Sequence, residues 1–397
     1  MKNSSRLLAS VALFGAASGA YAQSSVTLYG IIDESVAYSS SEASSVTAQG
    51  HRNFKTLTGE LSGDRWGLRG VEDLGGSLKA IFTLENGFQG TTGKLAQGGL
   101  LFGRQAFVGL TSPGLGTLTM GRQYDFGYDF LGSFTAWSQF MGTLGAHVGD
   151  NDNLYQTIRS NNTVKYQTPT VHGLTAGVLY GFSNQAAGTG GAGFANNRDY
   201  NFAVSYDGGP FKGGVSYMRL DSPSSANSSN PNGAIAANQY TLGASSIFYN
   251  YSSVNRQSVI AAGGSYAFPL FSVSAVFSDS TLDYADGTRL RLDNYEINAK
   301  KLITPSWLVG LGYTYTAGFG EGGMSIKPFA SGNHPAWQQV NVGTEYFLSK
   351  STTLHLATVL QFATRDATTA AINFNGAVSG ANSYKQIAVV AGIRHNF

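Results

Sequence analysis

Six histidines are the first side chains in this sequence that could do chemistry, because imidazole binds metals and carries protons near neutral pH. No two of them form a His-x-x-x-His spacing, and the chain has no cysteine to complete a Cys/His set. A zinc site therefore has little support. We expect most of these residues in loops or near strand ends. They are His51, His147, His172, His334, His355 and His395.

Other motifs that carry chemistry are also missing. The glycine-rich residues 188–193 are not followed by Lys-Ser or Lys-Thr, so they predict a flexible loop rather than a phosphate cradle. No Gly-x-Ser-x-Gly elbow precedes a helix-like segment. Residues 283–286 could bind calcium, although carboxylates on exposed loops are usually solvated. We therefore expect no catalytic residue, no cofactor and no metal, and the protein is not predicted to be an enzyme.

The first 22 residues have the pattern of a cleaved secretory signal. Lys2 and Arg6 give a positive start, residues 7–17 are mostly apolar, and Ala20-Tyr-Ala22 fits the small-x-small cleavage rule. Loss of Lys2 and Arg6 lowers the 25 basic residues to 23, equal to the 23 acidic ones. The mature chain from Gln23 then has a formal charge of zero, and no basic surplus remains to favour a nucleic-acid partner.

After residue 23 the dominant period is two, which is the period of a β-strand. Residues 306–318 and 384–397, for example, alternate apolar side chains with small or polar ones. The apolar faces often have aromatic ends, which suits a lipid-facing band better than a soluble sandwich. No run of 18 apolar residues follows Ala22, so the hydropathy excludes a helical membrane protein. Otherwise only a closed barrel can cross a bilayer, because each backbone N–H and C=O must be paired internally.

The connections between these segments alternate in length, as expected for a barrel with turns at one end and loops at the other. Seven short connections carry Gly, Pro, Asp or Ser, which preset turn dihedrals. Together with eight long loops they join sixteen antiparallel strands, enough to leave a water-filled lumen. The predicted strands cover residues 25–38, 64–73, 77–88, 103–112, 117–124, 160–168, 174–183, 198–207, 211–220, 257–268, 270–283, 290–303, 306–318, 336–348, 352–366 and 384–397.

Five motifs are shared with a known family. They are Ser25-Val-Thr-Leu-Tyr-Gly30, Asp64-Arg-Trp-Gly-Leu-Arg-Gly-Val-Glu-Asp-Leu-Gly-Gly76, Arg104-Gln-Ala-Phe-Val-Gly-Leu110, Leu118-Thr-Met-Gly-Arg-Gln-Tyr-Asp125 and Gly392-Ile-Arg-His-Asn-Phe397. With them the chain resembles the general trimeric porins of Gram-negative bacteria, most closely their betaproteobacterial branch. The resemblance covers residues 23–397 and implies one all-β, sixteen-stranded transmembrane barrel in the outer membrane, with a third long loop at about 125–161 that folds inward.

The same resemblance places an arginine row in the pore. Arg65 and Arg104 match inward wall arginines, Arg159 matches a third one after the loop, and Arg69 lies on the face of Arg65 by alternation. The alternative is that these arginines are ordinary lumen or rim residues. An acidic row on the loop would set a transverse field across the waist, so that selectivity follows pore diameter and lining charge.

The acidic row is expected among the loop aspartates, although the Pro-Glu-Phe-Gly-Gly loop motif of the enteric porins is missing here. For Asp125 the alternative is a cap on the turn into the loop. Phe397 is expected to be a final lipid-facing aromatic and, by resemblance, the C-terminal signal that the barrel-assembly machinery recognises. The candidate aspartates are Asp125, Asp129, Asp150 and Asp152.

The function that the resemblance implies is passive diffusion of ions and small hydrophilic solutes through a homotrimer, in contact with lipid and lipopolysaccharide of the outer membrane. A substrate-specific channel on the same barrel is the second hypothesis. A stacked aromatic track for sugars, or a basic ladder for phosphate or organic acids, would favour it. The third is an adhesin or an outer-membrane enzyme, but no added passenger domain is present.

Overall fold

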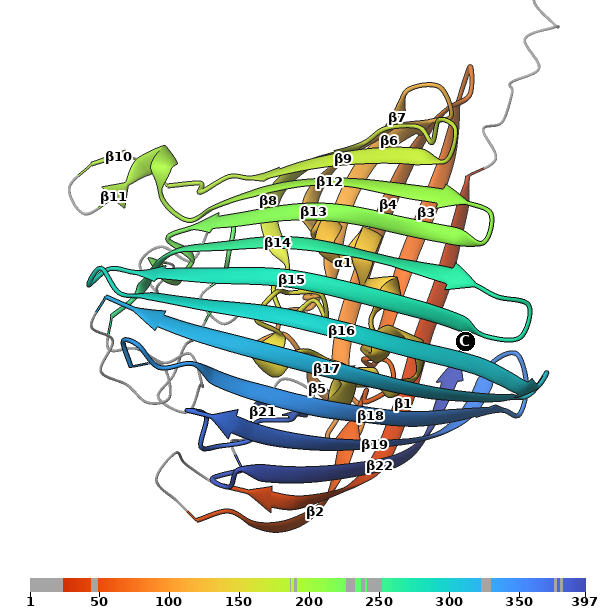
Figure 1. Cartoon of the computed structure of the whole chain (residues 1–397). Helices are drawn as coiled ribbons and strands as arrows, with labels where there is room; N and C mark the ends of the chain where they lie inside the picture. The colour runs from red at the N-terminus through yellow and green to blue at the C-terminus, as the bar shows by residue number, and fades with distance from the viewer. Residues whose placement is uncertain are drawn as a thin grey trace, which may run out of the picture.

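The computed structural model describes residues 24–43, 49–185, 187–188, 191–225, 233–236, 240, 252–322, 330–374, 377–378 and 381–397. In these ranges one antiparallel sheet closes on itself around a lumen (Figure 1). No helix of the described chain is both long and apolar enough to cross a membrane. The predicted signal, residues 1–22, lies outside the described residues.

The barrel has the predicted sixteen strands, with β2 and β3 as two halves of the second. Short turns join them at one end and long segments at the other (Figure 1). The wall strands are β1 (Ser25–Glu42), β2 (His51–Thr58), β3 (Arg65–Gly75), β4 (Leu78–Gln89), β6 (Gln105–Ser112), β7 (Gly116–Gln123), β8 (Ser160–Gln167), β9 (Leu174–Gly181), β12 (Arg198–Gly208), β13 (Phe211–Asp221), β14 (Val254–Ala267), β15 (Ser272–Tyr284), β16 (Arg289–Thr304), β17 (Trp307–Glu321), β18 (Pro335–Phe347), β19 (Thr352–Arg365) and β22 (Lys385–Asn396).

Alternation of side chains decides which face of each strand meets the membrane. On β17, Leu311 and Tyr313 are exposed on the outside, whereas Thr314 and Thr316 are buried toward the lumen. The outer face is therefore apolar, and the inner face carries small and polar residues. The seven predicted short turns all lie at one end of the barrel, as the chain order and Figure 1 show.

The second strand is broken, which the sequence-based prediction of a single strand at 64–73 missed. β2 pairs with the far half of β1, and β3 pairs with its near half. Between them residues 59–64 leave the wall, beginning at Gly59, whose φ of 67° favours glycine. The prediction failed because 51–58 is mostly polar and charged, without the alternate apolar residues that mark a lipid-facing strand.

The remaining elements belong to the long connections. The third loop, residues 124–159 between β7 and β8, lies inside the barrel (Figure 1). It contains α1 (Phe126–Leu131), η1 (Gly132–Phe134), η2 (Trp137–Met141), η3 (Gly142–Gly145) and η4 (Val148–Asp150). The other loops contain β5 (Lys94–Leu95), β10 (Ala187–Gly188), β11 (Gly191–Ala192), η5 (Gly193–Ala195), η6 (Pro223–Ser225), β20 (Asn373–Phe374) and β21 (Ala377–Val378).

Candidate functional site

Glycines on the inner wall position the third loop. A Cβ at Gly177 would lie 2.3 Å from the ring of Phe126, and one at Gly310 would lie 2.2 Å from the ring of Phe140. The loop rings therefore sit directly on the backbone of β9 and β17, where any side chain on the wall would displace them. Both phenylalanines are fully buried. Within the loop, α1 packs against β9, β12, β13 and β14, and η2 packs against β17, β18 and β19.

A buried ionic cluster ties the loop to the wall. The ring of His147 lies between two carboxylates, with Nδ1 2.6 Å from Asp152 Oδ2 and Nε2 3.0 Å from Glu296 Oε2. Asp152 comes from the loop and Glu296 from β16. Ser278 donates its hydroxyl to Asp152 over 2.5 Å. Burial alone would lower the pKa of His147, but the two carboxylates raise it well above its ordinary value.

The inward residues 59–64 form a second contact between the wall and the third loop. The Thr143 N–H donates to the backbone oxygen of Glu60 over 2.7 Å, so the loop tip contacts this segment. Asp33 on β1 accepts from the Ser62 N–H over 2.6 Å and donates its own N–H to Asp64 over 2.7 Å. The break in the second strand thus brings a segment of wall to the middle of the lumen.

Between these supports lies a cavity of about 860 Å³, lined by Arg65, Arg104 and Arg159. Two of these guanidinium groups are fixed by partners within the protein. Arg104 Nε lies 2.7 Å from Glu85 Oε1, and Arg65 Nε donates to the Gly63 oxygen over 2.9 Å.

One tyrosine supports two of these arginines. The guanidinium carbons of Arg104 and Arg159 lie 5.9 and 5.5 Å from the ring centre of Tyr124. Three of the four arginines predicted from the sequence therefore meet at one place. The fourth, Arg69, is exposed on the same face of β3 with its guanidinium 5.3 Å from the ring centre of Tyr29, and it is not among the residues that line the cavity.

The predicted aspartates do not line this cavity. Asp125 is buried and caps α1, where it accepts from the Tyr128 N–H over 2.9 Å, which is the capping role given as its alternative. Asp152 belongs to the His147 cluster, and Asp129 forms an ion pair with Lys165 on β8. Asp150 is buried and accepts from the backbone N–H groups of residues 155 and 157. An acidic constriction role for these residues stays a prediction.

Aromatic rings and two carboxyls that sequence reasoning did not single out also line the cavity. The loop contributes Tyr128, Trp137 and Tyr155, and the inward segment contributes Glu60 and Asp64. Burial raises the pKa of Glu60 to about 8, and neither of its carboxyl oxygens has a hydrogen-bond partner among the described residues. The ring-rich composition of 124–155 was the available signal for the aromatics, whereas nothing local marked Glu60.

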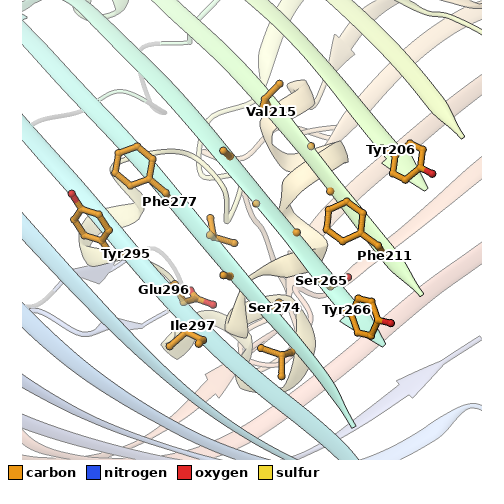
Figure 2. Close-up of a pocket in the computed structure, with 18 of the residues that line it drawn as sticks. Tyr206, Phe211, Val215, Ser265, Tyr266, Ser274, Phe277, Tyr295, Glu296 and Ile297 are labelled. Carbon is orange, nitrogen blue, oxygen red and sulfur yellow. The ribbon is translucent and has the colours of Figure 1, made fainter. Parts of the chain in front are cut away.

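A second hollow, of about 1140 Å³, lies on the outer face of the barrel (Figure 2). Tyr206, Phe211 and Tyr266 stand on one side of it, and Phe277 and Tyr295 stand on the other (Figure 2). Small residues of β13 to β15 form the floor, so this surface is apolar and faces away from the lumen. The described part of the chain has no group of three or more His, Cys, Asp or Glu placed to hold a metal.

A closed antiparallel barrel with an inward loop and a cavity lined by arginines defines a diffusion channel of the outer membrane rather than an enzyme. A family model described as Gram-negative porin matches residues 9–368. An outer membrane porin of Bordetella pertussis is 32% identical over 82% of this chain and 77% of its own length. Outer membrane porin protein 32 of Delftia acidovorans is 30% identical over 98% of this chain and 99% of its own. The chain belongs to the Gram-negative porin family.

Solved structures agree with this fold. The anion-selective porin from Comamonas acidovorans superposes with a TM-score of 0.71 at 25% identity, covering 94% of this chain and 100% of that one. OmpT of Vibrio cholerae, in a trimer form, superposes with a TM-score of 0.65 at 14% identity, over 94% of this chain and 99% of its own, a likeness of fold alone.

Proposed function

We propose that this porin passes small anions in preference to cations. The observation that carries the proposal is the meeting of Arg65, Arg104 and Arg159 at the cavity, to which the third loop contributes no carboxylate. The cavity lining also includes Glu60 and Asp64, but Glu60 is mostly neutral at pH 7 because burial raises its pKa to about 8. Lining charge sets the sign of selectivity. The similar porin from Comamonas acidovorans is anion-selective.

The experiment is a reversal-potential measurement in a planar bilayer under a KCl gradient. A charge about 8 Å from a permeating ion changes its energy by roughly 0.5 kcal/mol in water, so Arg65→Gln with Arg104→Gln should lower the anion preference about two- to fivefold. Arg65→Gln alone should shift it in the same direction with less effect on folding, because it leaves the buried Arg104–Glu85 pair intact. Arg289→Gln, at the exposed rim of β16, is the matched control.

Two results would count against the proposal. One is a cation-selective native pore, and the other is an unchanged reversal potential in both arginine variants. Heat-modifiable migration in gels shows whether each variant barrel is folded before its conductance is measured.

We infer that the channel assembles as a homotrimer. A protein of the same fold, OmpT of Vibrio cholerae, has been solved in a trimer form. Exposed apolar residues on the outer wall of β1, β6 and β7, such as Val26, Leu28, Val108 and Met120, would be covered by neighbouring copies. Conductance in steps of three and a trimer mass in native mass spectrometry would support this. A monomer mass with single conductance steps would contradict it.

We infer further that export removes residues 1–22. The support is the charged start, the apolar run and the small-x-small site of the sequence. N-terminal sequencing of protein isolated from outer membranes should begin at Gln23, and an intact residue 1–22 segment would refute the inference.

A further inference from the structure

Two chemically different groups of side chains line the cavity. One is Arg65, Arg104 and Arg159, and the other is the loop rings Tyr128, Trp137 and Tyr155. A solute that enters therefore meets both positive charge and aromatic surface.

The rings form a connected group. Tyr128 and Trp137 stack with centroids 5.9 Å apart and an interplanar angle of 16°. Tyr155 meets Trp137 edge-on, at 5.3 Å and 89°. The polar atoms of Trp137 and Tyr155 are already engaged, since the Trp137 indole N–H donates to the Leu154 oxygen over 3.0 Å and the Tyr155 hydroxyl lies 2.9 Å from that of Thr143. These two side chains therefore offer mainly apolar ring surface to a solute.

The arginines are fixed beside the cavity. Arg104 is 3% exposed and Arg159 is 7% exposed, and Nη2 of Arg104 and Nε of Arg159 have no hydrogen-bond partner among the described residues. Those two nitrogens are closed to solvent, so these arginines act on a solute in the cavity mainly through their positive charge. Glu85 and Tyr124 hold Arg104 in place, and Tyr124 also supports Arg159.

The arginines and the rings lie close together. The guanidinium carbons of Arg104 and Arg159 lie 5.9 and 5.5 Å from the ring centre of Tyr124, and that ring centre lies 4.8 Å from the ring centre of Tyr128. One small solute can therefore contact both groups. In agreement with this geometry, burial raises the pKa of Tyr128 and of Tyr155 to about 12, and Arg104 opposes the rise at both hydroxyls.

We propose that this cavity is a binding site for aromatic carboxylates, which the pore admits in preference to aliphatic ones of equal charge. The positive charges of Arg65, Arg104 and Arg159 attract the carboxylate, and the ring packs against Trp137 and Tyr128. Ring packing favours planar solutes over saturated ones of the same size. The inference rests on the proposed anion preference and adds a substrate class to it.

The test compares three probes for their block of chloride current through the native channel in a planar bilayer. Benzoate carries both ring and charge, cyclohexanecarboxylate has the charge without a planar ring, and benzyl alcohol has the ring without the charge. We expect benzoate to reach half-block at a concentration about threefold or more below that of cyclohexanecarboxylate, and benzyl alcohol to block least.

Variants assign the effect to the loop rings. Trp137→Leu should bring benzoate and cyclohexanecarboxylate to equal block, whereas Trp137→Phe, which keeps a ring, should retain the preference for benzoate. Trp307→Leu, on the outer face of β17, is the matched tryptophan control and should behave as the native channel.

The outcomes separate the two proposals. Anion preference in KCl together with equal block by benzoate and cyclohexanecarboxylate overturns the aromatic site alone. A preference for benzoate that persists in a folded Trp137→Leu channel also overturns the aromatic site. Cation preference in KCl overturns the proposed anion selectivity, which the reversal potential reports independently of any block.

Discussion

At the scale of single residues, Glu60 should make the selectivity of the pore depend on pH. Burial, with help from the charge of Asp33, raises its pKa to about 8, while Lys55 opposes the rise. The carboxyl is therefore mostly neutral at pH 7 and becomes negative as the pH rises through 8. A new negative charge near the arginines should lower the anion preference about twofold between pH 7 and pH 9.

Reversal potentials across that pH range measure this directly, and Glu60→Gln should remove most of the dependence. Glu321→Gln, at the exposed end of β17, should leave it unchanged. If the dependence persists in Glu60→Gln, the titrating group lies elsewhere.

The sequence predicted the positions of some residues of the site but not of others. Arg65 and Arg104 were predicted because each belongs to a contiguous motif, and alternation along a strand fixes the face of such a residue. The loop aspartates could be named but not placed. Asp152 is held by Ser278, and its partner His147 is held by Glu296, contacts between residues more than 100 positions apart. No local pattern carries such contacts.

At the scale of elements, the His147 cluster should hold the third loop against the wall. Because the two neighbouring carboxylates raise the pKa of His147 well above its ordinary value of 6.5, the ring is charged at neutral pH. His147→Gln would leave Asp152 and Glu296 buried without a cation, and breaking a buried ion pair costs about 3–5 kcal/mol. Urea unfolding of the detergent-solubilised barrel, followed by tryptophan fluorescence, should show this loss.

The pH dependence of that loss has a definite sign. A raised histidine pKa contributes stability that is complete below about 6.5 and disappears as the pH rises through the pKa of the folded state. The difference between the native protein and His147→Gln should thus shrink at alkaline pH. A difference that stays constant would mean that the ring acts only by packing and hydrogen bonding.

The strands themselves were predictable, with one exception. Alternation of apolar and small residues located β16, β17 and β19 to within three residues of their ends, because a two-faced wall imposes that period on every strand that crosses lipid. β2 was not predicted because its residues lack this alternation of apolar and small side chains. Alternation along the strand correctly placed glycines such as Gly310 on the inner face of the wall. Only the folded loop shows why these positions lack a side chain, because the Phe140 ring packs directly on Gly310.

At the scale of the whole molecule, closure depends on the last residue. The N–H and C=O of Phe397 exchange hydrogen bonds with those of Gly30, each over 3.0 Å, at the start of the seam between β1 and β22. A Cβ at Gly30 would lie 2.2 Å from the Phe397 ring, so the ring covers the glycine on the outer face. Phe397 is 51% exposed there, which agrees with a lipid-facing aromatic. Its role as an assembly signal stays a prediction.

Phe397→Ala separates the two roles because it keeps the backbone bonds to Gly30 and removes only the ring. If the ring is a signal, the level of folded porin in the outer membrane should fall severalfold, while refolding of the purified variant in detergent stays close to that of the native chain. If the ring only packs at the seam, both measurements should fall together. Tyr384→Ala, an exposed aromatic beside the opposite end of β22, is the matched control and should lower neither. If Phe397→Ala and Tyr384→Ala lower the level of folded porin in the outer membrane equally, a signal specific to Phe397 is excluded. The loss would then reflect a general need for aromatic rings near the ends of the last strand.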